Sequence, residues 1–415
     1  MSNTAKIKTS RIKETGNREA TVLEHDSFRI MIDDQGGMIP ELSALSGMAG
    51  INAHWLPWFR SNSGKPYNEK TDREFWKAPL LFHLAGNFPC LPSFGGGHII
   101  DEINMPTHGW TANLPWKFKD IMRTEKIAWA SSTMKSPESA MPLSFKKIDA
   151  IVKGHNIHYS SITVKNHGKT DQEISAGWHN TLGAPFLAEG ARISACADAW
   201  ITSPKGSEFE KTTRLAIGAE FKKLSRAPLI KKGNADISIV PGPIGYTDFA
   251  AGRVPAKADI GWSSLVNPGL KMAYICFFTG PAAAGDDDII LRFNNLWMQY
   301  GGRPFTPWAA YEGGTDLAYC LGTENSIAAY AEGLKYARKV KKVLDAPATV
   351  TIPAGKEMTL RYGTLFAPYT QNLLDGGIDE IEPEKGALLC LAKKERFGFA
   401  ADPCFSILKE LEKAI

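Results

Sequence analysis

The stretch HNIHYSSITVKNHGKTDQEISAGWHNTLGAPFL, from His155 to Leu187, is the most informative segment of the sequence. It contains a strand pattern that ends in Val164-Lys165-Asn166, followed by a turn signal at His167-Gly168-Lys169. A second strand pattern then leads to Trp178-His179-Asn180. The stretch therefore predicts an antiparallel hairpin that places His179 at a strand end, where its side chain can enter a cleft while its backbone stays fixed.

The same texture continues along the chain, which from Ser27 onward consists of short apolar segments bounded by Gly, Pro, Asn and Asp. Since no helix separates successive strands, antiparallel pairing is favoured, and the predicted fold class is a mostly β, large antiparallel β-sandwich. The expected strands are Phe28 to Ile32, Met38 to Leu45, Trp116 to Ala130, Leu143 to Val152, Ile157 to Asn166, Glu173 to Trp178, Ala191 to Ile201, Lys271 to Phe278, Asp316 to Leu321 and Glu357 to Thr364.

Two segments predict helices, and one predicts an arm. Residues 333–344 hold five Lys or Arg in a helix-compatible run, and Cys404 to Ile415 has apolar residues at helical spacing after Asp402-Pro403. We expect the second to form a short C-terminal helix on the rim of the sandwich. The basic, aperiodic residues 1–20 predict a flexible N-terminal arm, and residues 21–415 a single domain.

Composition and charge exclude several classes of protein. The chain has 415 residues, of which 43% are hydrophobic and 22% charged, so it can bury a sizeable core. A formal charge of +4 is too small over this length for a nucleic-acid-binding footprint. Six cysteines without a CxxC pair predict neither a zinc knuckle nor a disulfide framework. No stretch reaches the roughly 18 apolar residues of a membrane helix, so a cytoplasmic protein is expected.

Three segments hold the candidate chemistry. The first is Trp178-His179-Asn180, and the second is Pro106-Thr107-His108-Gly109-Trp110, where the glycine lets the backbone approach a ligand closely. The third is Cys320-Leu321-Gly322-Thr323-Glu324-Asn325, an apolar strand that ends in a glutamate. In this arrangement the chain resembles the galactose mutarotase-like superfamily, that is, the aldose 1-epimerase family, over roughly residues 25 to 370.

The resemblance implies both the fold and the reaction. It implies a supersandwich and an isomerase that interconverts sugar anomers by acid–base ring opening, on a free or phosphorylated hexose. It also implies Glu324 as the base, His179 as the acid, and His108 as the hydrogen-bond partner of the ring or of a neighbouring hydroxyl. Because only protons move, no metal and no cofactor is expected. The sequence departs from the family motifs at Asn180, after the acid, and at Asn325, after the base.

Five more residues are expected to bind the sugar. Asn87 matches a family loop that holds sugar hydroxyls. Trp110 and Trp308 lie in predicted aromatic loops whose ring faces stack on the C–H faces of sugars. Arg292 and Arg303 can hold hydroxyls or a phosphate. The structural alternatives are tryptophans that plug the ends of the core and arginines in salt bridges.

The histidines and the glutamate have structural alternatives too. His179 and His108 fit hydrogen-bonded structural histidines, and a glutamate after a strand is often a solvated strand end. His155 and His158 would lie on opposite faces of a strand, so they are interpreted as surface residues without a shared metal.

Two other functions stay open. A non-catalytic carbohydrate-binding sandwich is suggested by the replacements at Asn180 and Asn325, and a lyase or hydrolase acting on oligosaccharides is suggested by the aromatic-rich loops. In each case the expected partner is a sugar, with neither nucleic acid nor membrane. The sequence does not set the oligomeric state.

Overall fold

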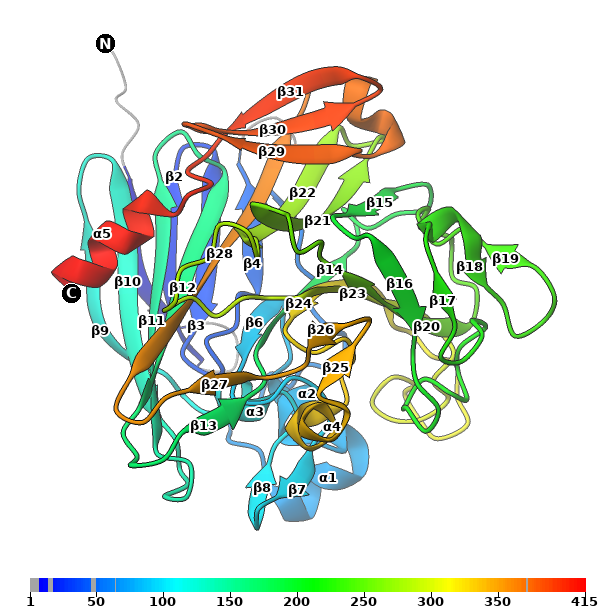
Figure 1. Ribbon diagram of the computed structural model, residues 1–415, viewed down its shortest axis with the longest axis horizontal. Coiled ribbons are helices and arrows are strands. Elements are labelled where there is room, and N and C mark those ends of the chain that lie inside the picture. Colours follow the sequence, from blue (N-terminus) through cyan, green and yellow to red (C-terminus); the bar gives the residue numbers. More distant parts are fainter. Residues whose placement is uncertain (1–6, 14–17, 46–49, 64, 371) are drawn as a thin grey trace.

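The computed structural model describes residues 7–13, 18–45, 50–63, 65–370 and 372–415, and two large antiparallel sheets dominate it (Figure 1). The eight-stranded sheet has the order β15 (Arg192–Ala195), β21 (Ile260–Asn267), β22 (Met272–Thr279), β28 (Glu357–Pro368), β12 (Ile157–Asn166), β11 (Leu143–Val152), β10 (Ile127–Lys135) and β9 (Lys117–Arg123). The seven-stranded sheet has the order β17 (Glu220–Phe221), β16 (Ala199–Thr202), β20 (Tyr246–Arg253), β23 (Phe293–Tyr300), β24 (Tyr319–Ser326), β14 (Gly177–Gly183) and β6 (Asn87–Cys90). The predicted mostly β, antiparallel sandwich is confirmed.

The inner faces of these two sheets share one apolar core. Ile162 and Tyr362 from the eight-stranded sheet are buried in the same cluster as Leu182 and Met298 from the seven-stranded sheet. The ring of Tyr362 stacks on that of Trp178, with centroids 4.8 Å apart. Full burial of each large apolar side chain contributes about 1.5–3 kcal/mol, so this shared core holds the sheets face to face.

Smaller sheets and short helices surround the sandwich. A five-stranded sheet adds to the same core, and four two-stranded ladders and one three-stranded sheet complete the described strands. Their strands are β1 (Lys8–Lys13), β2 (Glu19–His25), β3 (Phe28–Asp33), β4 (Glu41–Ala44), β5 (Ile51–Asn52), β7 (His98–Ile100), β8 (Ile103–Met105), β13 (Gln172–Ile174), β18 (Ala227–Pro228), β19 (Asn234–Ala235), β25 (Lys342–Val343), β26 (Ala346–Pro347), β27 (Val350–Ile352), β29 (Glu380–Glu384), β30 (Ala387–Ala392) and β31 (Glu395–Ala400). The helices are α1 (Glu69–Trp76), α2 (Pro79–His83), α3 (Gly109–Asn113), α4 (Gly333–Val340), α5 (Ser406–Ala414) and the 3₁₀ turns Leu224–Arg226 and Asn372–Gly376.

The C-terminal part of the chain covers the outer face of the eight-stranded sheet at one end. Leu408 of α5 is buried in a second core together with Tyr159 of β12 and Leu388 of β30. The Asp402 carboxylate accepts a hydrogen bond of 2.8 Å from the Ile407 amide in the first turn of α5, which stabilises the start of the helix. The two predicted helices, at residues 333–344 and Cys404 to Ile415, are both present as α4 and α5.

The prediction of a flexible arm over residues 1–20 is wrong for Lys8–Lys13. This segment is β1, which pairs antiparallel with β2, and its Arg11 guanidinium binds the Asp34 carboxylate at 2.6 Å. A solvated edge strand of a sheet carries charged residues on both sides of the ladder, which is why it lacks an apolar period. Residues 1–6 and 14–17 lie outside the described residues. The single-domain assignment of residues 21–415 stays a prediction.

The predicted hairpin that delivers His179 is also wrong. Strand β12 pairs with β11 and β28 in the eight-stranded sheet, whereas β14 lies between β24 and β6 in the seven-stranded sheet. Between them the chain forms β13, which pairs with β27. The turn at His167-Gly168-Lys169 therefore begins the connection from the eight-stranded to the seven-stranded sheet. The two sheets face each other, so β12 and β14 bury their inner sides in the shared core from opposite directions.

Other predicted strands fare unevenly. Leu143–Val152 and Ile157–Asn166 have their predicted bounds, as β11 and β12. The expected strands Trp116 to Ala130 and Ala191 to Ile201 each divide into two strands, β9 with β10 and β15 with β16. No described helix is long and apolar enough to cross a membrane. None of the six cysteines, all of them in the described part of the chain, forms a disulfide.

Candidate active site

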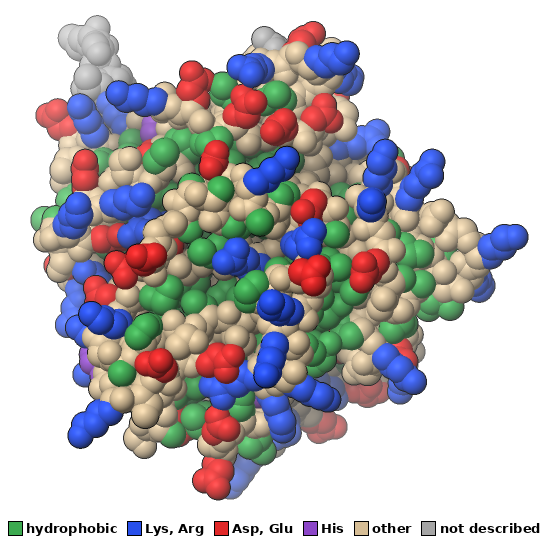
Figure 2. All heavy atoms as spheres, in the orientation of Figure 1, with side chains coloured by type: hydrophobic (Ala, Val, Ile, Leu, Met, Phe, Trp, Pro, Cys, Tyr) green, Lys and Arg blue, Asp and Glu red, His purple; other side chains and the backbone are tan. Residues whose placement is uncertain are grey.

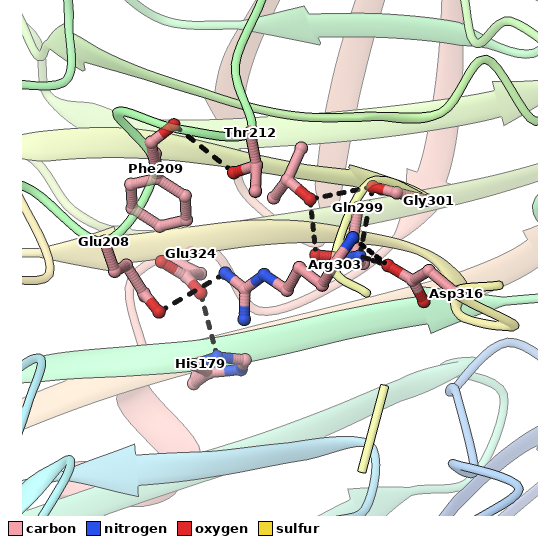
Figure 3. A network of polar contacts seen from close by, with 10 residues as sticks. His179, Glu208, Phe209, Thr212, Gln299, Gly301, Arg303, Asp316 and Glu324 are labelled. Carbon is pink, nitrogen blue, oxygen red and sulfur yellow. Dashed lines mark hydrogen bonds and ion pairs between the residues drawn. The ribbon is translucent and has the colours of Figure 1, made fainter. Parts of the chain in front are cut away.

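The candidate site is built on β14 and β24, two neighbouring inner strands of the seven-stranded sheet. Because Trp178 is paired with Asn325, the antiparallel register brings His179 opposite Glu324. The His179 Nε2 atom lies 2.9 Å from Glu324 Oε1, and the two side chains are 6% and 3% exposed (Figure 3). The prediction that both residues stand at strand ends is wrong, since each lies inside a strand with neighbours on both sides. This ladder fixes both backbones.

Side chains on three sides hold the His179 imidazole. The Phe88 ring stacks on it with centroids 4.6 Å apart, and the Trp297 ring meets it at 5.6 Å. Its Nδ1 atom shares a hydrogen bond of 3.0 Å with the Thr181 hydroxyl. Since an ionised carboxylate only accepts hydrogen bonds, Nε2 carries the proton shared with Glu324. The imidazole is therefore fixed with a proton on the nitrogen that faces the carboxylate.

The two carboxylate oxygens of Glu324 differ in their hydrogen bonding. Its Oε1 atom is bound to His179, whereas the buried Oε2 atom has no hydrogen-bond partner among the described residues. A buried acceptor without a partner costs about 1–3 kcal/mol, so this oxygen is ready to accept a hydrogen bond from a ligand. The pair thus combines a protonated nitrogen with an unoccupied acceptor.

His108 lies beside this pair. Its ring meets that of His179 edge to face, with centroids 4.9 Å apart, and its Nδ1 atom accepts a hydrogen bond of 3.2 Å from the Gly95 amide. Burial lowers the pKa of His108 well below its ordinary value, and the nearby His179 lowers it further. His108 is therefore neutral, with its proton on Nε2, and serves as a hydrogen-bond donor. It precedes α3 in the left-handed region, at a φ of 60°.

Arg303 supplies the cation of the site. It is 4% exposed, and its Cζ atom lies 4.6 Å from the ring centroid of Trp308. Its Nη2 atom is 3.3 Å from the Glu208 carboxylate, and its backbone amide donates a 2.9 Å hydrogen bond to Asp316, as Figure 3 shows. The ring of Trp308 is covered on this side by the guanidinium, so it positions Arg303 rather than offering that face to a ligand.

These side chains line one pocket. It has a volume of about 320 Å³ and includes His108, His179 and Glu324 together with Arg303 and Trp308. Its apolar walls come from α2, from Phe249 on β20 and from Trp297 on β23. The structure thus brings together five of the eight residues that the sequence singled out.

The other three predicted site residues do not line this pocket. Asn87 is buried between the sheets, where its Nδ2 atom donates a 3.1 Å hydrogen bond to Asn180, because its neighbour Phe88 takes the pocket side of β6. Trp110 is buried in the main core as part of the helix α3, not in a loop. Arg292 precedes β23, with its backbone amide bonded to Ser326 at 2.8 Å. The structure does not bring these three side chains to this pocket.

Sequence reasoning missed several residues of the pocket. Trp297 carried a usable signal, since on β23 it lies two residues beyond Asn295, the ladder partner of Glu324, and so shares its face. Glu208, Phe209 and Glu332 lie outside the strands, and no sequence pattern places them. Burial raises the pKa of Glu332 to about 7, and the charge of Glu208 adds to this effect. Its carboxyl group is therefore half-protonated near neutral pH.

Two further histidine predictions can be compared with the structure. His158 is buried, not on the surface, and its Nε2 atom lies 2.8 Å from the Asp149 carboxylate, which also binds the buried Lys147. Burial lowers the pKa of His158. His155 is partly buried and shares a 2.7 Å hydrogen bond with the Tyr159 hydroxyl. Among the described residues, no group of three His, Cys, Asp or Glu is placed to hold a metal ion.

Asn180 and Asn325 point to the opposite face of the seven-stranded sheet. The Nδ2 atom of Asn180 donates a 2.6 Å hydrogen bond to the Tyr362 hydroxyl, and this hydroxyl donates to Asn325. Asn325 in turn donates a 2.6 Å hydrogen bond to Asn294. These two asparagines therefore connect β14 and β24 to the other sheet, directly behind the pair in the pocket.

Comparisons with known proteins support the architecture. No family model and no curated protein matches the chain by sequence. A solved structure from Klebsiella pneumoniae, of a protein provisionally assigned as an aldose 1-epimerase, is 14% identical, with a TM-score of 0.61 over 87% of this chain and 83% of that one. A galactose mutarotase-like protein from Clostridium acetobutylicum is 11% identical, with a TM-score of 0.57 over 88% of this chain and 99% of that one. The fold implied by the resemblance is confirmed.

Proposed function

We propose that this chain, which has the galactose mutarotase-like fold, is an aldose 1-epimerase-like isomerase that interconverts sugar anomers by acid–base ring opening. The observation that carries the proposal is the contact of 2.9 Å between His179 and Glu324 on the floor of a pocket. The volume of about 320 Å³ suits a single sugar ring better than a polymer. The aromatic and charged walls suit the two kinds of surface that a sugar presents.

The reaction requires two coordinated proton transfers. Glu324 takes the proton of the anomeric hydroxyl while His179, as an imidazolium, protonates the ring oxygen and becomes a neutral imidazole, and the bond between the anomeric carbon and the ring oxygen breaks. Rotation about the C1–C2 bond then turns the aldehyde, and closure of the ring returns both protons. The sum leaves the enzyme unchanged and transfers no hydride or electron, so the proposal includes no cofactor.

The geometry supports this division of roles. Glu324 Oε2 has no partner among the described residues and is the oxygen assigned to the anomeric hydroxyl. The proton on His179 Nε2 is the one assigned to the ring oxygen, so an entering sugar must separate the bond between the two residues. Neutral His108 donates a hydrogen bond to the ring or to a neighbouring hydroxyl. Arg303 binds a hydroxyl or, in a phosphorylated hexose, the phosphate.

A second candidate function is a carbohydrate-binding sandwich without turnover. The direct bond between His179 and Glu324 favours it, because an acid and a base that satisfy each other compete with a substrate. Sugar binding that survives both Glu324→Gln and His179→Ala, without anomer exchange in the unmodified protein, would establish this alternative. Release of reducing ends from polysaccharides would instead indicate a hydrolase or lyase.

Anomer exchange tests the main proposal directly. Freshly dissolved single anomers of free hexoses and hexose phosphates are followed by polarimetry or by exchange NMR, with and without the protein. Acceleration is expected for at least one sugar and should disappear in Glu324→Gln. The matched control is Glu395→Gln, an exposed glutamate on β31, which should equal the unmodified protein. No acceleration across the panel would contradict the proposal.

A further inference from the structure

A second hollow lies on the opposite side of the sandwich from the pocket. It is a groove of about 1210 Å³ on the outer face of the eight-stranded sheet, lined by β9, β10, β11, β12, β28 and the end of α5. The three-stranded sheet β29 to β31 covers the same face at its other end, and the end of α5 reaches the groove. Lys and Arg side chains, blue in Figure 2, are frequent on the left of that view, where Figure 1 places β9 to β12 and α5.

The groove concentrates positive charge. Seven lysines line it, and none of them forms an ion pair with another described residue. Its arginine, Arg361, is paired with Asp288 and Glu412. The whole chain carries a formal charge of only +4. The lysines of the groove are therefore a local concentration of positive charge and do not reflect a high net charge of the protein.

The strand register arranges these lysines in rows. In one row Lys117 of β9 is paired with Thr133 of β10, which is paired with Lys146 of β11 and then Thr163 of β12. Each lysine is thus followed by a hydroxyl on the next strand. Neighbouring strands are about 4.8 Å apart, so lysines of one row are separated by about 10 Å.

A neighbouring row begins in the same way. Lys135 of β10 is paired with Ser144 of β11, and Ser144 with Lys165 of β12. Lys165 is then paired with Glu357 of β28, so this row ends in a carboxylate. Lysines on an edge strand protect the sheet from pairing with other chains, which explains those on β9. That explanation fails for Lys146 and Lys165, because β11 and β12 are inner strands of the sheet.

We propose that this groove binds an acidic polysaccharide, a linear sugar polymer whose carboxylates or sulfates are separated by neutral, hydroxyl-rich sugar. Its anions would meet the lysines, and its hydroxyls the Thr and Ser side chains between them. A nucleic-acid strand carries a phosphate about every 3.4 Å, which is much denser than the lysine spacing. The lining also offers no exposed aromatic ring on which bases could stack. This site does not depend on the activity of the pocket.

Binding of labelled hyaluronan, in which a neutral sugar separates successive carboxylates, is measured by fluorescence anisotropy at low and high salt and tests the proposal. The variant Lys117→Gln/Lys135→Gln/Lys146→Gln/Lys165→Gln should bind at least about tenfold more weakly, since each exposed ion pair contributes modestly. The matched control Lys222→Gln/Lys223→Gln/Lys231→Gln/Lys232→Gln removes the same charge from exposed lysines around β17 to β19 and should bind like the unmodified protein. Neutral dextran should not bind.

A second measurement uses the unmodified protein and therefore does not depend on whether the variant folds. Hyaluronan should protect Lys146 and Lys165 from acetylation, read by mass spectrometry, and leave Lys222 reactive. The proposal would be overturned by absent binding, by equal losses in both quadruple variants, or by uniform protection of the lysines. Tighter binding of duplex DNA or of phosphatidylserine vesicles would overturn it as well.

Discussion

The two faces of the seven-stranded sheet use adjacent residues of the same strands for different purposes. On the outer face His179 and Glu324 meet in a pocket, with one carboxylate oxygen left without a partner. On the inner face Asn180 and Asn325 are bound to one tyrosine hydroxyl in the core. Successive side chains of a strand point to opposite faces. A step of one residue therefore separates the pair that faces the pocket from the asparagines that bind the other sheet.

The largest expected effect comes from the outer face. The substitution His179→Asn removes the group assigned as the acid and should lower the anomer exchange rate by about 10²–10⁴-fold, the usual contribution of a positioned proton-transfer group. The Asn amide lies near the position of Nδ1, beside Thr181, and leaves Glu324 without its partner, so Tm should fall and the rate is compared per folded molecule. A rate within threefold of the unmodified protein would remove His179 from the mechanism.

A substitution of Arg303 separates substrate binding from the chemical step on the outer face. Arg303→Lys keeps the charge but loses the planar group that lies on Trp308 and reaches Glu208. Loss of a charge-assisted hydrogen bond should raise KM by about 10–100-fold while kcat changes less. Steady-state kinetics separates the two parameters. A fall in kcat at constant KM would place Arg303 in the chemical step instead.

The inner face is expected to affect stability first. Tyr362→Phe removes the hydroxyl shared by Asn180 and Asn325, and the resulting unpaired buried groups should lower the free energy of unfolding by about 1–3 kcal/mol. Urea denaturation measures this loss. The control is Tyr369→Phe, which removes a tyrosine hydroxyl that is bonded to Asp375 outside this network. Its free energy of unfolding should fall less than that of Tyr362→Phe.

The smallest effect concerns pH. Burial raises the pKa of Glu332 to about 7, so the folded protein holds this proton more tightly than the unfolded chain does. The stability that this proton contributes is complete at acid pH and is lost as the pH rises through about 7. Glu332→Gln should therefore flatten the fall of Tm between pH 5 and pH 8. An unchanged pH profile would contradict the assignment.

The sequence was sufficient for the residues that follow a motif or a period. His179, Glu324 and His108 were found because short motifs in a fixed order resemble those of a family, and Arg303 and Trp308 because rare side chains stood beside glycine and proline. The structure brings all five into one pocket.

The sequence failed where long-range pairing decides the outcome. The turn signal after β12 predicts a hairpin, whereas strand pairing places β14 in the other sheet. The family resemblance predicts Asn87 in the pocket but does not give the register of β6. A shift of one residue along a strand moves a side chain to the other face, and the pocket side is taken by Phe88 instead. Glu208 and Glu332 reach the pocket only because segments distant in sequence fold beside it, and no local pattern records that.

The most direct test of the account compares one small change on each face. Anomer exchange per folded molecule is measured by two-dimensional exchange NMR for the unmodified protein, Glu324→Gln and Tyr362→Phe, on the sugar that the unmodified protein accelerates most. Exchange should disappear in Glu324→Gln and stay within about tenfold of the unmodified protein in Tyr362→Phe. Exchange that survives Glu324→Gln but is lost in Tyr362→Phe would contradict it.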